Sequence, residues 1–362
     1  MILLHNRIKA IERHPMKTYL QHGKFRFHAI FCLSFFFFYH TAWAGKTLEA
    51  IKQKDQISCG VNTGLAGFGS SDSQGNWTGL DVDICRAIAS AVLGSADKVR
   101  FVPLSAPQRF AALQSGEIDI LSRNTTFSLT RDASLGLNQT AVTFYDGQGF
   151  MVPTKSKFKS AKQLRGASVC VQSGTTTEKN LNDFSKANML AVKPIVFEKL
   201  EAANAAYFSG RCKAYTTDAS GLASIRSKEA KDPKEHMILP ELISKEPLGP
   251  MVRRGDDEWF AITKWVIYGL LEAEELGINS KNIEVQKNQS TDPAVLRLLG
   301  KSDDMGKLLG LDREWIARSV AQVGNYAEIF DRNVGEKTPL ALKRGLNALW
   351  SQGGLQYPMP IR

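Results

Sequence analysis

Two stretches far apart in this chain carry the same short pattern: LQSGEIDILSRN at 113–124 and YFSGRCKAYTTD at 207–218. In each stretch a Ser-Gly pair is expected to end a helix, and a strand follows it. Asn124 and Asp218 each stand eight residues after the glycine of that pair. If two lobes share one strand–helix–strand plan, these two residues occupy equivalent strand ends and face each other. The repeat therefore predicts two similar lobes.

Short apolar runs alternate with amphipathic helical patterns along the chain, which is typical of an α/β fold with helices flanking a sheet. Ile84, Ile88 and Val92 recur at helical spacing, and this helix is expected to begin at Asp81 as its N-cap and to end at Gly94. The part of the chain that follows residue 257 is expected to be helical. The predicted strands are 57–61, 99–104, 118–121, 167–171 and 195–197.

Two glycine- and proline-containing stretches, Tyr145–Pro153 and Ser244–Pro250, are candidates for crossings between the lobes. Paired crossings that absorb backbone rotation are what hinge closure needs. The predicted organisation is a removed segment at 1–44, a first lobe at 45–149 and a second lobe at 150–248. Residues 249–362 then complete the first lobe and form a helical C-terminal tail.

The N-terminal segment is interpreted as a secretory signal peptide rather than as part of the fold. Six Lys/Arg precede an apolar run, Ala29–Tyr39, that is too short for a stable membrane anchor. Ala42-Trp43-Ala44 supplies a small-x-small cleavage site, so cleavage is predicted after Ala44. Met16 is an alternative start to Met1. Because the segment also carries one Glu, its removal lowers the formal net charge from +10 to +5.

Four cysteines remain after this cleavage: Cys59, Cys85, Cys170 and Cys212. Export to an oxidising compartment favours disulfides, and four cysteines allow three pairings. The pairs 59–85 and 170–212 are favoured, because each stays within one lobe and leaves relative motion of the lobes free. Buried reduced thiols are the alternative.

Several function classes lose support from the sequence. Of six histidines only His236 lies outside the N-terminal segment, so a histidine-based triad or a multi-histidine metal site is disfavoured. No phosphate-binding G-x-x-x-x-G-K-[ST] or nucleophile-elbow G-x-S-x-G motif occurs. The mature chain has no dense basic cluster interleaved with aromatic residues, which argues against nucleic-acid binding. No catalytic residue, cofactor or metal is predicted.

The stretch Ser122–Arg131, SRNTTFSLTR, follows a predicted strand and is rich in hydroxyl and amide groups. A loop at the carboxyl end of a strand is a usual binding position in open α/β sheets, and an Arg fork matches a carboxylate. Arg131 has an alternative as an exposed helix-start residue paired with Asp132. Asp218 is either a polar strand end that faces the site or a helix N-cap. Thr175 and Thr176 stand where a helix begins, where unpaired N–H groups favour an anionic group, and their alternative role is to cap that helix.

The segments NWTGLDVDICRAIASAV, FVPLSAPQRFAALQSGEIDILSRNTTFSLTRD and VCVQSGTTTE resemble the extracellular solute-binding proteins, family 3, of polar amino-acid ABC importers. The tail, VGNYAEIFDRNVG with RGLNALWSQGGLQYPMPIR, resembles more narrowly the general L-amino-acid-binding subfamily. The resemblance covers essentially the whole mature chain. It implies a two-lobed periplasmic-binding-protein type II fold and a monomer in the periplasm that delivers L-amino acids to an inner-membrane permease.

The resemblance also implies individual contacts. Arg131 matches the arginine that grips the α-carboxylate, and Asp218 matches the acid that pairs with the α-ammonium. The resemblance further implies ligand contacts from Asn124 and Thr126 in the first lobe and from Thr176 in the second. Arg109 stands where family members that favour acidic side chains also carry an arginine, so it is a candidate contact for the ligand side chain. A solvated helix position is the alternative for Arg109.

One departure concerns ligand specificity. In the positions just before Phe68, many relatives have an aromatic residue that covers the ligand, whereas this chain has Leu65-Ala66-Gly67. The expected ligands are polar amino acids, Glu, Gln, Asp and Asn first, or a broader set. A ligand-loaded partner of a chemoreceptor is the alternative function, and a lyase or dehydratase on the same fold is a weaker one.

Overall fold

The computed structural model describes residues 46–362, and these residues lie within one compact unit. The predicted signal peptide, its cleavage site and the choice between two start positions lie outside the described residues. Within 46–362, no helix is both long and apolar enough to cross a membrane.

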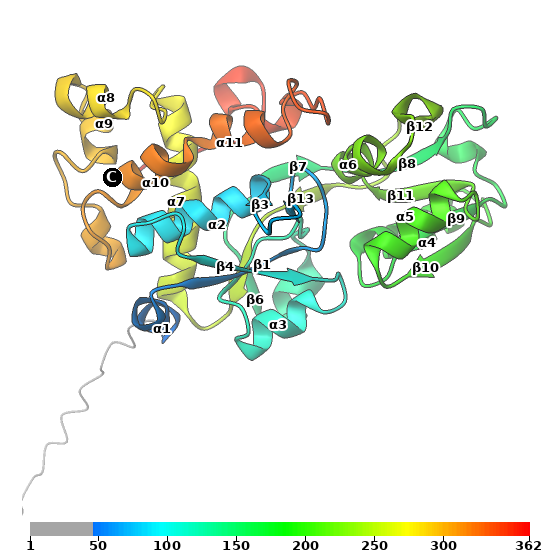
Figure 1. The fold of residues 1–362 in the computed structure, drawn as a ribbon, viewed down its shortest axis with the longest axis horizontal. Helices are drawn as coiled ribbons and strands as arrows, with labels where there is room; N and C mark the ends of the chain where they lie inside the picture. Colours follow the sequence, from blue (N-terminus) through cyan, green and yellow to red (C-terminus); the bar gives the residue numbers. More distant parts are fainter. Residues whose placement is uncertain (1–45) are drawn as a thin grey trace, which may run out of the picture. The chain divides into compact units, whose positions relative to one another are not determined.

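The first lobe is built on a five-stranded mixed sheet that matches the predicted α/β class (Figure 1). Three neighbouring strands run parallel, a fourth runs antiparallel to them, and a fifth pairs antiparallel with the fourth. In sheet order these are β4 (Val99–Leu104), β1 (Ile57–Asn62), β5 (Ile120–Leu121), β14 (Met251–Arg253) and β6 (Leu137–Gln139). All six residues of β1 are buried, because β1 is an inner strand covered on both faces.

A glycine in the middle of β1 allows a close approach of neighbouring side chains. A Cβ at Gly60 would lie 2.5 Å from Cδ1 of Ile118 and 2.8 Å from Cδ1 of Leu104. Both neighbours belong to the small apolar cluster under α3 (Arg109–Ser115), which ends at Gly116 in the left-handed conformation as the sequence predicts. Gly60 therefore lets the strand that leads to the site lie directly on this cluster.

The helix that follows β1 begins earlier than expected, and its N-cap lies two residues before the predicted one. α2 (Leu80–Leu93) has Gly79 as its N-cap, with φ at 138°. The Asp81 N-cap prediction is wrong, because Asp81 lies inside the first turn and its carboxylate reaches the loop after β5. A Cβ at Gly79 would lie 2.1 Å from the carbonyl oxygen of Phe68, so only glycine fits there. The helix ends at Gly94, as predicted.

The second lobe repeats the plan of the first. Its sheet, in order, is β10 (Lys193–Phe197), β9 (Ser168–Gln172), β11 (Ala214–Asp218), β8 (Gln148–Pro153) and β12 (His236–Ile238). Again three parallel strands are followed by an antiparallel fourth, so β11 holds the position that β5 holds in the first lobe. Its helices are α4 (Thr176–Ala187), α5 (Leu200–Phe208) and α6 (Ala219–Glu229).

The chain passes between the lobes twice, through the two predicted crossing stretches. β7 (Phe144–Asp146) and β13 (Glu246–Leu248) pair antiparallel as a separate two-stranded ribbon. β7 leads directly into β8 of the second sheet, and β13 returns directly into β14 of the first (Figure 1). The lobe boundaries at 149/150 and 248/249 stay predictions.

The cysteines form the two disulfides that the sequence analysis favoured. Cys59 on β1 joins Cys85 on α2 with 6.4 Å between Cα atoms, and Cys170 on β9 joins Cys212 with 5.6 Å. Each bridge stays on one side of the crossing ribbon. The bridges therefore stiffen the lobes without tying one lobe to the other.

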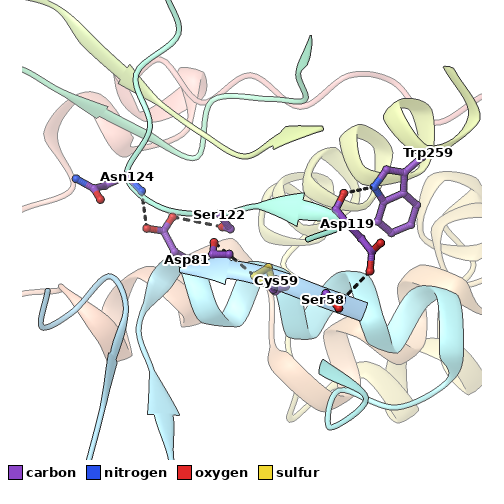
Figure 2. The surroundings of a disulfide bond; sticks show 9 residues. Ser58, Cys59, Asp81, Asp119, Ser122, Asn124 and Trp259 are labelled. Atoms are coloured by element: carbon purple, nitrogen blue, oxygen red, sulfur yellow. Dashed lines mark hydrogen bonds between the residues drawn. A yellow bond between two sulfur atoms is a disulfide. The ribbon is translucent and has the colours of Figure 1, made fainter. Parts of the chain in front are cut away.

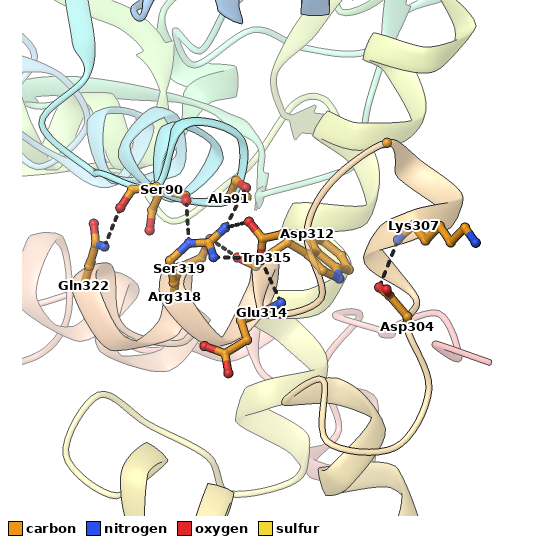
Figure 3. A network of polar contacts seen from close by, with 12 residues as sticks. Ser90, Ala91, Asp304, Lys307, Asp312, Glu314, Trp315, Arg318, Ser319 and Gln322 are labelled. Atoms are coloured by element: carbon orange, nitrogen blue, oxygen red, sulfur yellow. Dashed lines mark hydrogen bonds and ion pairs between the residues drawn. The ribbon is translucent and has the colours of Figure 1, made fainter.

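The C-terminal tail is helical, as expected, and packs on the first lobe. Its elements are α7 (Asp257–Glu275), α8 (Ile283–Gln289), α9 (Pro293–Leu298), α10 (Trp315–Val323) and α11 (Tyr326–Asn333). Figure 3 shows Arg318 of α10 at the end of α2, where it donates to the carbonyl oxygens of Ser90 and Ala91. Ser319 Oγ donates to the carbonyl oxygen of Ala87 in the middle of α2. The tail therefore supplies a donor to the Ala91 carbonyl, which the helix end would leave unpaired, whereas Ser90 O also accepts from the N–H of Gly94.

Candidate ligand-binding site

The two lobes touch through side chains that the sequence analysis selected. Asn124 Nδ2 donates to Asp218 Oδ2 over 3.4 Å, and the hydroxyl groups of Thr126 and Thr176 lie 3.3 Å apart. The first residue of each pair follows β5, and the second belongs to β11 or α4. The repeat thus placed Asn124 and Asp218 correctly as facing residues. We call the region formed by Arg109, Asn124, Thr126, Arg131, Thr176 and Asp218 the interlobe site.

Arg131 lies in a single π-helical turn, Thr130–Ser134, and its side chain turns inward. It is 6 % exposed, and its Nη1 donates to the carbonyl oxygen of Thr126 over 2.8 Å. The alternative of an exposed residue paired with Asp132 is wrong, because Asp132 pairs instead with Arg254 at 2.6 Å. Burial lowers the pKa of Arg131 to about 10, although nearby carboxylates oppose this shift.

Arg109 is the first residue of α3 and is only 3 % exposed, so the alternative of a solvated helix position is wrong. Its Nε is buried and has no hydrogen-bond partner among the described residues. The guanidinium groups of Arg109 and Arg131 lie 4.7 and 5.1 Å from the ring centre of Phe110. Burial, together with the positive charges of Arg131 and Arg123, holds the pKa of Arg109 well below its usual range. A buried cation of this kind is costly without an anionic partner.

The loop that carries Asn124 is fixed in an unusual backbone conformation. Asn124 has φ at 29°, and its N–H donates to the carboxylate of Asp81 over 2.8 Å (Figure 2). Its side-chain Oδ1 accepts from Nδ2 of Asn62, the last residue of β1, over 3.0 Å. These two partners turn the Asn124 amide toward the second lobe. Neither contact was predicted from the sequence, although the position of Asn62 at a strand end is a signal for the second one.

Asp218 ends β11 and stands at the N-cap position of α6, but its side chain makes no cap hydrogen bond. It is 5 % exposed. Burial, and then the negative charges of Asp146 and Glu246, raises the pKa of Asp218 well above its usual range. Burial also raises the pKa of Asp146 to about 6. The second lobe and the ribbon therefore bring a cluster of acids to the interlobe site, and two of them, Asp218 and Glu246, are buried.

Thr176 is the first residue of α4, and Thr175 caps that helix by accepting from the N–H of Glu178 over 3.1 Å. The capping alternative thus holds for Thr175. Thr176 instead directs its hydroxyl to the interlobe site. The start of α4 carries unpaired N–H groups and the positive end of the helix dipole, which suits an anionic group.

Glu246 of the crossing ribbon is a residue that the sequence analysis missed. It is 1 % exposed, and its Oε2 accepts from the hydroxyls of Thr126 at 2.6 Å and Thr176 at 2.9 Å. Its presence in a predicted crossing stretch was the one available signal. No group of His, Cys, Asp or Glu suited to a metal ion occurs in the described part of the chain.

The arrangement separates opposite charges between the lobes. Two buried guanidinium groups come from the first lobe, whereas Asp218 comes from the second. A zwitterion can pair each of its ends with one lobe, which compensates the cost of burying its charges. Two similar α/β lobes joined by a paired ribbon, with the polar groups gathered at their junction, define a type II periplasmic binding protein.

The chain belongs to the bacterial extracellular solute-binding proteins, family 3, and the model of that family matches residues 57–282. It is 55 % identical over 324 residues to the general L-amino acid-binding periplasmic protein AapJ of Rhizobium johnstonii, covering 89 % of this chain and 94 % of that relative. It is 48 % identical over 321 residues to the glutamate/glutamine/aspartate/asparagine-binding protein BztA of Rhodobacter capsulatus, covering 89 % and 95 %.

Solved structures give the same fold. A periplasmic binding protein of an ABC transporter from Brucella ovis, solved with glutathione bound, has a TM-score of 0.85 and 52 % sequence identity. The comparison covers 87 % of this chain and 99 % of that one. It therefore extends beyond residue 282 into the C-terminal tail.

Proposed function

We propose that this protein captures an L-amino acid between its two lobes in the periplasm and delivers it to an ABC permease of the inner membrane. The observation that carries the proposal is the burial of Arg131 and Asp218, opposite charges from opposite lobes, in one interlobe site. Relatives that are 55 % and 48 % identical are named as amino-acid-binding proteins, which supports the same ligand class here.

Each end of the ligand has its partners. Arg131 and the start of α4 at Thr176 bind the α-carboxylate, through an Arg fork and the N-terminal end of a helix. Asp218 pairs with the α-ammonium. Asn124 and Thr126 complete the contacts from the first lobe. This division follows from charge, because a cation and an anion must each meet the opposite sign when water is excluded.

Arg109 binds an acidic or amide side chain of the ligand. Its burial and its unpartnered Nε support this role, since a ligand oxygen would satisfy the donor and offset the buried charge. We therefore expect Glu, Gln, Asp and Asn to bind, with acidic ligands gaining most. The stretch Leu65-Ala66-Gly67 stands where many relatives have an aromatic residue over the ligand, which leaves more room for variation in the ligand side chain.

Capture works by a shift between open and closed arrangements of the lobes about the β7–β13 ribbon. A ligand that touches both lobes binds the closed arrangement better than the open one, and this difference is what moves the equilibrium. For export, we propose that residues 1–44 are a signal peptide cleaved after Ala44, which leaves the mature chain in the periplasm.

The test is a thermal-shift and calorimetry screen of the mature protein with the common L-amino acids. Bound ligands should raise the melting temperature by mass action, and the polar amino acids should lead. Each ligand should be recovered unchanged, as expected for a carrier rather than an enzyme. Failure of every amino acid to bind, or conversion of one to a product, contradicts the proposal.

A further inference from the structure

The carboxylate of Glu246 lies where the two lobes and the crossing ribbon meet. Its two oxygens contact partners in different parts of the molecule. Oε2 accepts from one hydroxyl of each lobe, Thr126 and Thr176, at 2.6 and 2.9 Å. Oε1 accepts from Ser244 Oγ at 2.6 Å and from Asn180 Nδ2 at 2.7 Å, both on the second-lobe side. One oxygen therefore joins the lobes, while the other fixes the side chain to one of them.

The two hydrogen bonds to Oε2 depend on how the lobes are placed relative to each other. An ionised carboxylate only accepts hydrogen bonds, and a threonine hydroxyl has one proton to donate. Both hydroxyl protons are therefore directed to Glu246 while the lobes are together. The two hydroxyls lie 3.3 Å apart and share one acceptor oxygen, so a separation of the lobes by more than a few ångströms must break at least one of the bonds to Oε2. Glu246 is 1 % exposed in this arrangement, and leaving a buried acceptor without its donor costs free energy.

We propose that Glu246 is a positioning residue that stabilises the closed arrangement by accepting one hydroxyl proton from each lobe, and so sets ligand affinity without touching the ligand. The proposal rests on the proposed function for its ligand and for the closing motion. It differs from a specificity role, because a group that acts only on closure changes the affinity for every ligand by the same factor.

The same geometry explains why a charged residue is useful at this place on the ribbon. Glu246 lies opposite Asp146 in the β7–β13 pair, so it is anchored on the segment about which the lobes move. From there its side chain reaches the loop after β5 and the start of α4 at once. Hydrogen bonds to a charged acceptor are about twice as strong as neutral ones, which makes one carboxylate an effective link.

The experiment compares four proteins: wild type, Glu246→Ala, Glu246→Gln and Ser244→Ala. The glutamine variant keeps the shape and one acceptor oxygen but not the charge. The Ser244→Ala variant removes one bond to the same carboxylate and leaves both bonds between the lobes. Calorimetry with L-glutamate and L-glutamine measures affinity, and small-angle X-ray scattering of the ligand-free proteins measures their compactness. Circular dichroism checks the fold of each.

We expect Glu246→Ala to weaken both ligands by the same factor, about 10-fold or more, and to give a larger radius of gyration without ligand. Glu246→Gln should lie between this variant and wild type, and Ser244→Ala should stay close to wild type. If Glu246→Ala does not fold, Glu246→Gln decides by the same two measurements. A change for one ligand alone, equal effects of Ser244→Ala and Glu246→Gln, or unchanged compactness overturns the inference.

The two proposals fail in different ways. If the wild-type protein binds neither amino acid, the proposed function is wrong for these ligands. The comparison of ligand-free radii still decides whether Glu246 holds the lobes together. If wild type binds both ligands and the variants match it in affinity and compactness, the role of Glu246 fails and the proposed function stands.

Discussion

The side-chain amide of Asn124 donates to the carboxylate of Asp218 across the junction of the two lobes. The two residues are 94 positions apart in the sequence, yet they occupy matching places in two sheets of the same strand order. Under the proposed function, opening of the lobes breaks this contact, and a ligand ammonium group placed there competes for the same carboxylate. The pair therefore lies where the proposed ligand binding and the proposed lobe closure meet.

Arg131→Ala is expected to abolish useful binding. The substitution leaves a desolvated ligand carboxylate without its cationic partner, and truncating one partner of such a pair costs about 2–5 kcal/mol. Affinity for L-glutamate should therefore fall by about 30-fold or more in calorimetry. Asp132→Asn is the control, because Asp132 neighbours Arg131 but pairs with exposed Arg254. An affinity within threefold of wild type in Arg131→Ala would reject the assignment.

Binding is expected to depend on pH through Asp218. In the ligand-free protein its pKa is raised above the ordinary value by burial and by the charges of Asp146 and Glu246. The ligand ammonium requires the ionised carboxylate, so affinity should fall as the pH drops through that raised pKa, and binding should release protons. Calorimetry in two buffers of different ionisation enthalpy measures this release. An enthalpy that does not depend on the buffer would contradict it.

The same shift has a consequence for the stability of the ligand-free protein. A carboxyl group whose pKa is higher in the folded state binds more protons there than in the unfolded chain. Its contribution to the free energy of unfolding is therefore present at low pH and is lost as the pH rises through the folded pKa. Asp218→Asn should make both the free energy of unfolding and the ligand affinity depend less on pH. Because the amide carries no charge to pair with the ligand ammonium, this variant should also bind more weakly.

Arg109→Gln is expected to change ligand preference more than overall binding. Removing the buried guanidinium takes away a charge-assisted partner for a ligand side-chain carboxylate, whereas an amide side chain loses less. The affinity for L-glutamate should fall by about 10-fold or more relative to that for L-glutamine. Arg100→Gln on β4 is the control, because its guanidinium bonds Ser58 and the Glu117 carbonyl, outside the interlobe site. Equal losses for both ligands would place Arg109 outside the ligand side-chain contacts.

Asp81→Ala is expected to destabilise the protein and to weaken binding together. The variant leaves the partly buried N–H of Asn124 without its acceptor, which costs about 1–3 kcal/mol of the free energy of unfolding in urea titrations. Asp81→Asn keeps an acceptor oxygen and should retain both properties at pH 7. Burial raises the pKa of Asp81 to about 6, so its charge is itself costly there. If both variants lose stability equally, the charge rather than the hydrogen bond holds the loop.

Part of this protein could be predicted from the sequence because the signals are local. Helix ends at Gly94 and Gly116, strands of apolar residues and the repeated Ser-Gly pattern depend on residues a few positions apart. The disulfide pairs could be favoured because each pair stays within one predicted lobe. Local rules misassigned Asp81, because its carboxylate bonds a loop 43 residues away instead of capping its own helix.

The sequence by itself determined the fold class and the two polar strand ends, since backbone conformation and apolar periodicity are encoded by near neighbours. Tertiary structure alone decided that Arg109 is buried rather than solvated and that Glu246 joins hydroxyls from both lobes. Glu246 lies 120 positions from Thr126 and 70 from Thr176. Burial and partners at such separations depend on how the crossing strands bring the lobes together, which no local pattern records.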